Sequence, residues 1–169
     1  MENKVLHYAT FAGAPSSAVL QVETATVGGA ATASANVIVT VTSASVTGSP
    51  LATNVAVTNG DSAATVAGKI RTALAAVAAI TAVFTVGGSS ATVTLTNLVS
   101  AANDATLNIA IDGTTNSTGV PNAASSANTT AGVYGTYRGL PNGTSLLDTT
   151  NGKRYRNYGT EALPVWTAQ

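Results

Sequence analysis

The sequence has no cysteine, a single histidine and few charged side chains, and each scarcity excludes a class of function. Without cysteine, the chain forms neither disulfide bonds nor thiolate metal sites. His7 lies in a region with little periodicity, and we expect it to be a solvated or partner-contacting side chain. No serine lies in a Gly-x-Ser-x-Gly motif, so the sequence does not predict the catalytic triad of a hydrolase.

Charged residues make up only 8% of the 169 positions, against about 25% in an ordinary soluble domain. Basic and acidic side chains cancel to a net charge of zero, so we expect no nucleic-acid partner. No run of about 18 apolar residues could span a membrane, and no apolar stretch after the first four residues indicates a signal peptide. So little charge suits a protein that is packed into an assembly.

Composition divides the chain into four regions. Residues 1–35 form a leader with little periodicity, which we expect to be an extended N-terminal docking arm. Residues 36–112 have the patterns of a compact domain, and residues 113–133 read as a linker rich in Ser, Thr, Asn and Ala. Residues 134–169 hold four of the five tyrosines and the only tryptophan, which predicts a separate C-terminal unit.

The central region predicts an α+β fold that is mainly β. Val37, Val39 and Val41 alternate along one strand, a turn at 47–50 leads to a returning strand over 51–58, and further strands follow at 83–86, 92–96 and 107–111. Between them, Asp61 or Ser62 is suited to begin a helix. Its apolar stripe is formed by Val66, Ile70, Leu74 and Val77, while Lys69 and Arg71 are expected to face water. The order β-β-α-β-β-β places one amphipathic helix on an antiparallel sheet.

The C-terminal unit has the pattern of a small β-hairpin, with a turn at Asn151-Gly152 inside residues 147–155. A hairpin of this size is marginal alone in water, so we expect it to need a partner surface, either its own domain or another subunit. The basic and aromatic cluster at 153–158 resembles a strand-binding groove, but a solvated face or a subunit contact accounts for it better.

Paired carboxylates are the remaining candidate catalytic groups, since a glycosidase needs two of them roughly 5–9.5 Å apart. The candidates are Glu23, Asp61, Asp104, Asp112, Asp148 and Glu161. A helix cap or a turn accounts for most of them, and the Asn103-Asp104 pair lacks the surrounding pattern of a calcium loop. We therefore predict no catalytic, cofactor-binding or metal-binding residue, and no enzymatic activity.

Residues 36–112 resemble a module of tailed-bacteriophage virion proteins that occurs in tail-sheath, tail-fibre and head-associated proteins. The resemblance rests on a strand, a Gly-Asp-Ser-Ala segment that opens a helix, and the strands that follow. The matching segments are 37–42, 47–51, 55–63, the helix 65–78, 84–88, 93–96 and 102–107. The chain lacks the other domains of a tail sheath and the long repetitive shaft of a tail fibre.

A second resemblance lies at the C-terminus. Residues 143–155, Asn157, Gly159-Thr160 and the Pro164-Val165-Trp166 segment are similar to a short β-unit of phage fibre and head-fibre proteins. The resemblance implies that Trp166 is the apolar anchor of this unit and that such units meet in trimers.

Together the two resemblances imply a non-enzymatic virion structural protein that decorates the capsid surface, as a decoration or head-fibre protein. Its expected partners are the major capsid protein or other virion proteins and further copies of itself, through Tyr155, Tyr158 and Trp166. A tail-tip, baseplate or short tail-fibre adaptor is the first alternative. A protein that binds or cleaves a host surface glycan is the second, and its sugar platform would add Asp148 and Arg154 to those three aromatic residues.

Overall fold

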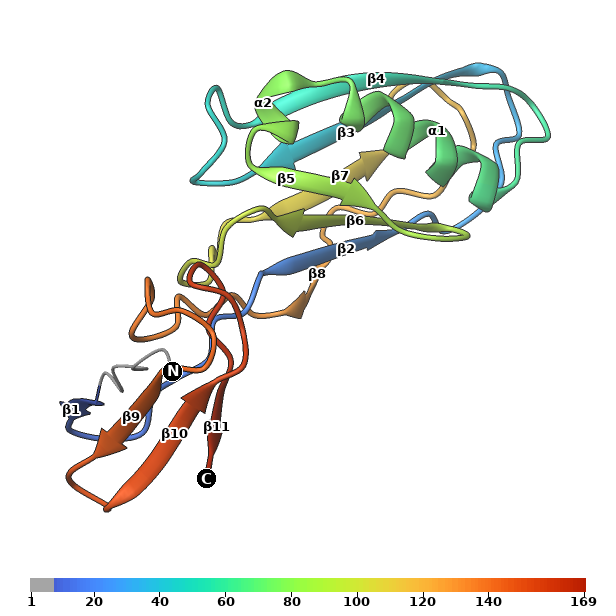
Figure 1. Ribbon diagram of the computed structural model, residues 1–169. Coiled ribbons are helices and arrows are strands. Elements are labelled where there is room, and N and C mark those ends of the chain that lie inside the picture. The colour runs from blue at the N-terminus through green and yellow to red at the C-terminus, as the bar shows by residue number, and fades with distance from the viewer. Residues whose placement is uncertain (1–7) are drawn as a thin grey trace, which may run out of the picture. The chain divides into compact units, whose positions relative to one another are not determined.

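The computed structural model describes residues 8–169 and divides the chain into two compact units (Figure 1). Unit 2 consists of residues 20–98 and 103–131. Unit 1 consists of residues 99–102, residues 132–169 and the N-terminal piece that ends at residue 19.

Two antiparallel sheets build unit 2. In the first, β3 (Ala35–Thr42) lies between β4 (Leu51–Val57) and β7 (Asn108–Asp112). The second has the order β5 (Phe84–Gly87), β6 (Thr92–Asn97), β2 (Val22–Thr26) and β8 (Ala127–Thr130). Side chains at alternate positions of each strand point to one face, and this places the valines of β3 in the core, where all three are fully buried.

Helix α1 (Ala63–Ala75) packs on strands of both sheets, β4 of the first and β5 and β6 of the second. Its buried stripe is Val66, Ala67, Ile70 and Leu74, spaced as a 3.6-residue period requires. A short helix, α2 (Ala78–Thr81), follows and buries Ile80. The sequence predicts one helix to residue 78, whereas the structure ends α1 at Ala75 and begins a second helix three residues later.

Unit 1 is a four-stranded sheet of order β1-β9-β10-β11. The hairpin of β9 (Ser145–Asp148) and β10 (Lys153–Asn157) turns at the predicted place. β11 (Trp166–Ala168) pairs with β10, and β1 (Tyr8–Phe11) pairs with β9 in parallel. A small core holds the sheet together, with Leu146 and Trp166 buried and Leu140 and Tyr155 packed against them.

The predicted fold class is confirmed, but the chain is organised differently from the four regions expected. The leader 1–35 contributes β2 to a sheet of unit 2, and the linker 113–133 contributes β8 to the same sheet. Residues 8–19 belong to unit 1 together with the hairpin. β2 and β8 are short, and they carry mainly Thr, Ala, Asn and Glu rather than an alternating apolar face. The sequence pattern therefore does not predict them.

Candidate interaction surfaces

Trp166 belongs to the core of unit 1. Its side chain is only 8% exposed, and its indole N–H donates to the carbonyl oxygen of Thr136 at 3.1 Å. The ring of Tyr137 meets the indole edge-to-face, with a centroid distance of 6.4 Å. The expectation that Trp166 anchors its own unit fits this position, but its burial leaves little surface for the predicted subunit contact.

The other two predicted contact residues differ in exposure. Tyr155 is half-buried on β10, opposite Leu146 of β9. Tyr158 is 52% exposed, and the guanidinium of Arg156 lies over its ring, 5.6 Å from the centroid. Of the three residues, Tyr158 therefore offers the most surface to a partner.

A second tyrosine–arginine pair lies in the same unit. Tyr134 is 59% exposed, with the guanidinium of Arg138 placed 4.7 Å from its ring centroid. Arg138 is held in place because its Nε donates to the carbonyl oxygen of Ala162 at 3.1 Å. The sequence shows that this region is rich in tyrosine but does not distinguish Tyr134 from the others, since nothing local marks a tyrosine as exposed.

Exposed apolar side chains gather on unit 1. Six of the seven large apolar side chains that are exposed in the described part of the chain belong to it, and we call them the exposed apolar set: Val99, Val133, Tyr134, Tyr137, Tyr158 and Val165. The backbones of Tyr158 and Val165 are joined by a hydrogen bond of 2.8 Å. Contiguous exposed apolar groups mark interaction sites, and the neighbouring Tyr158 and Val165 make unit 1 the candidate interaction unit.

The exposed charge of unit 1 is positive. Residues 132–169 carry four cations, Arg138, Lys153, Arg154 and Arg156, against two anions, Asp148 and Glu161. Asp148 is fully buried. In the turn of the hairpin it accepts hydrogen bonds from the backbone N–H of Thr150 and the side chain of Asn151, and it accepts a further one from the backbone N–H of Gly13. The hydrogen bond from Asn151 lowers the pKa of Asp148, and burial opposes it.

The sugar platform predicted from Tyr155, Tyr158, Trp166, Asp148 and Arg154 is not formed. Asp148 and Trp166 are both buried and have structural partners. A sugar ring needs an exposed aromatic face, and the exposed tyrosine rings of unit 1 are at 134, 137 and 158 instead.

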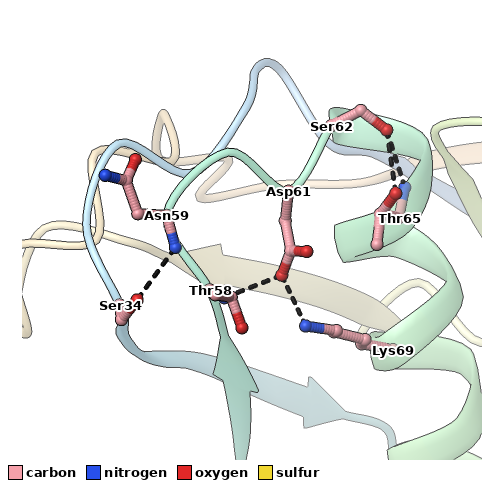
Figure 2. A network of polar contacts seen from close by, with 7 residues as sticks. All are labelled: Ser34, Thr58, Asn59, Asp61, Ser62, Thr65 and Lys69. Atoms are coloured by element: carbon pink, nitrogen blue, oxygen red, sulfur yellow. Dashed lines mark hydrogen bonds and ion pairs between the residues drawn. The ribbon is translucent and has the colours of Figure 1, made fainter.

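In unit 2, the predicted start of the helix is confirmed in detail (Figure 2). The Ser62 hydroxyl accepts a hydrogen bond from the backbone N–H of Thr65 at 3.2 Å. Asp61 accepts one from the backbone N–H of Thr58 at 2.7 Å and forms an ion pair with Lys69. The Lys69 hydrogen bond lowers the pKa of Asp61. Lys69 is therefore half-buried and paired rather than solvated as expected.

Arg71, the other side chain expected to face water, is also half-buried. Its guanidinium donates to the backbone carbonyl oxygens of Ser90 and Thr92. The cation thus connects α1 to the start of β6, an interaction between residues distant in sequence that a helical pattern cannot reveal.

Asp104 and Asp112 of unit 2 bind backbone and hydroxyl donors, whereas the buried Glu23 accepts a hydrogen bond from the Ser126 hydroxyl through Oε1 and its Oε2 has no partner. Asp104 accepts hydrogen bonds from Ser43, Ala44 and Thr106. Burial raises its pKa, but these bonds outweigh burial and lower it. Hydrogen bonds from Thr115 and Thr114 lower the pKa of Asp112 to about 2. No cluster of metal-ligating side chains occurs between residues 8 and 169, and His7 lies outside the described residues.

A groove of about 560 Å³ runs between β4 and α1. It is lined by three successive strand residues, Asn54, Val55 and Ala56, and by the helix residues Thr65, Gly68, Lys69, Thr72 and Ala73. Two of its lining residues, Thr65 and Lys69, belong to the network drawn in Figure 2. Most lining side chains are small, and the groove bears one cation, Lys69, which Asp61 neutralises.

No protein-family model matches the chain, and the searches of curated proteins and of solved structures return no match either. Within residues 8–169, no helix has the length and apolarity needed to cross a membrane.

Proposed function

We propose that the chain is a non-enzymatic structural protein of a tailed-bacteriophage virion and that it decorates the capsid surface. Its partners are the major capsid protein and further copies of itself, in the trimeric arrangement that the C-terminal resemblance implies. The observation that carries the proposal is the gathering of exposed tyrosines and arginines on unit 1. The two resemblances, over residues 36–112 and 143–166, supply the virion context.

Binding rather than chemistry is the function that these side chains suit. Tyrosine and arginine are enriched among the residues that carry the energy of protein interfaces, and in unit 1 they occur as two stacked pairs. A rigid ring with a guanidinium over it loses little conformational freedom when a partner covers it. The carboxylates described above have structural partners instead of facing a common cleft.

Immunogold electron microscopy of intact particles of the source phage tests the location. An antibody against the purified chain should place gold over the capsid. Gold confined to the tail would favour the alternative, a tail-tip, baseplate or short tail-fibre adaptor. Particles without any label would contradict both surface locations.

A paired substitution tests the role of unit 1. We expect Tyr158→Ala combined with Arg156→Ala to reduce attachment to particles, because the exposed ring and its stacked cation are lost together. Leu98→Ala is the matched control, since Leu98 is similarly exposed at 49% but belongs to unit 2. Equal attachment of both variants and the unchanged chain would exclude Tyr158 as a contact residue.

Glycan binding is the second candidate, and it rests on the exposed rings of Tyr134 and Tyr158. It predicts that host polysaccharide protects these tyrosines from chemical modification, while Tyr158→Ala weakens the binding. Release of reducing ends would add an enzymatic activity. If polysaccharide neither protects the rings nor is cleaved, this candidate is excluded.

A further inference from the structure

Strand β4 has one edge without a partner strand. It is the outer strand in the order β4-β3-β7, and among the described residues it pairs with β3 alone. At the opposite edge of this sheet, β7 has a further partner, because Ile111 forms a β-bridge with Ala123. In an edge strand, alternate residues direct their backbone N–H and C=O groups away from the sheet, where they are available to another extended chain.

Nothing in β4 discourages such pairing. Proteins protect exposed edges with charged residues, proline, bulges or very short strands. β4 has seven residues, Leu51–Val57, none of them charged and none of them proline. Its register with β3 runs without interruption from the Ala35–Val57 pair to the Val41–Leu51 pair. The strand is therefore regular along its whole length.

The groove beside α1 follows this edge. It contains Asn54, Val55 and Ala56, which are consecutive. Because consecutive side chains of a strand point to opposite faces, a groove that includes all three runs along the edge of the strand rather than over one face. Opposite them, Gly68 opens the helix side, since a Cβ placed there would meet no atom closer than 3.6 Å.

We infer that this groove binds an extended, uncharged segment of a partner protein, which adds to β4 as a further strand. Backbone hydrogen bonds to the edge would hold the segment, and alternate side chains would enter the groove. The short lining side chains of Thr65, Gly68, Thr72 and Ala73 leave room there for apolar side chains of the added strand. A charged side chain would lose hydration without compensation, since Lys69 is already paired with Asp61.

Selection from a displayed library of random peptides tests the inference. The library is selected on the unchanged protein and counter-selected on Gly68→Leu. That variant fills the groove but should keep the fold, because the site is open and leucine favours a helix more than glycine does. We expect enriched peptides without charge or proline at alternate positions, with binding lost in Gly68→Leu. In hydrogen exchange, an enriched peptide should slow exchange of the amides of β4.

Ala56→Lys is the second variant, because it places a charge on the exposed edge without altering the core. It should abolish binding of the same peptides. The inference would be overturned if the enriched peptides bound Gly68→Leu and Ala56→Lys as well as the unchanged protein. Protection from exchange at amides outside β4 would also overturn it. A concentration-dependent dimer that Gly68→Leu abolishes would overturn it in favour of a second copy as the occupant. These residues belong to unit 2, so the result is independent of the Tyr158 test.

Discussion

The two units of this protein are held together in different ways. Unit 2 has a continuous apolar core to which α1 and both sheets contribute, including fully buried Ile70, Leu74, Leu95 and Ile109. In the described part of unit 1, the apolar core consists of buried Leu146 and Trp166. Buried polar side chains that bind backbone groups, chiefly Asp148 and Asn157, add to it. Unit 2 also buries polar side chains, such as Gln21 and Thr118, but unit 1, with its small apolar core, depends on directed hydrogen bonds to a greater degree.

Asn157 shows how a small core can be ordered. Its side chain is fully buried and donates to the carbonyl oxygen of Leu140 at 2.8 Å. Its Oδ1 accepts from the backbone N–H groups of Gly159 and Val165 at 2.9 and 3.0 Å. One amide therefore fixes three loop positions around the sheet. An apolar residue of the same size could fill the space but could not satisfy these groups.

The largest effect is expected from Phe84→Ala, which removes a 2% exposed ring from the core of unit 2. The lost contacts and the resulting cavity should reduce the free energy of unfolding by about 3–5 kcal/mol. Urea unfolding followed by far-UV circular dichroism measures this. Thr85→Ala on the exposed face of the same strand is the control, and similar losses for both variants would contradict a packing-dominated unit 2.

Asn157→Ala tests the opposite claim for unit 1. Three partly buried backbone groups lose their partner, and we expect a loss of about 2–3 kcal/mol. Trp166 is the only tryptophan and lies in this unit, so thermal unfolding followed by its fluorescence reports on unit 1. The exposed Asn142, which donates to the carbonyl oxygen of Tyr158, provides the comparison. A loss no greater than that of Asn142→Ala would show that packing is sufficient.

A smaller effect is expected at the start of α1, one of the places where unit 2 depends on a directed hydrogen bond. Ser62→Ala removes the acceptor for the Thr65 N–H and should cost about 1 kcal/mol. Ser62→Asp retains an acceptor at this position and should restore most of the loss in thermal unfolding. Failure of aspartate to do so would mean that the serine acts through something other than capping.

The smallest effect is expected from Asp112, whose contribution to the stability of the fold changes with pH only under acidic conditions. The pKa of Asp112 is about 2 in the folded protein, against 3.8 for an unperturbed group. Because the folded pKa is the lower one, the carboxylate stabilises the fold fully above about pH 4 and progressively less as the pH falls through 2. The stability difference between the unchanged protein and Asp112→Asn should therefore shrink on acidification. A difference that is constant down to pH 2 would contradict this role.

The sequence predicted the parts of the fold whose pattern is local. The stripe of Val66, Ile70 and Leu74 located α1, and the alternating valines located β3. Strand β2 could not be recognised, because its sheet places the polar side chains Gln21 and Glu23 next to the core, 0% and 2% exposed. Gln21 is satisfied by two hydrogen bonds to the backbone of Asp104, 83 residues away. Partners at that distance leave no trace in a local pattern.

The candidate surface was predicted only in part, for a related reason. The sequence drew attention to the aromatic residues of the C-terminal unit, but it did not reveal which of them are exposed. Trp166 is buried because Thr136 and Tyr137 cover it, and Tyr134 is exposed although its neighbour Val133 pairs with Val19. Exposure depends on what the rest of the chain places over a residue, and composition does not contain that information.

The way the chain alternates between the units has a consequence for its synthesis. In unit 1, β1 pairs with β9 in a register that joins Tyr8 to Ser145, so β1 is synthesised well before the strand with which it pairs. Every strand and helix of unit 2 lies between these two. Domains fold as they emerge, and unit 2 can therefore be complete while unit 1 still lacks three of its four strands. Unit 1, which carries the exposed tyrosines, is therefore completed after unit 2, and its four strands come together only once β9 to β11 have been made.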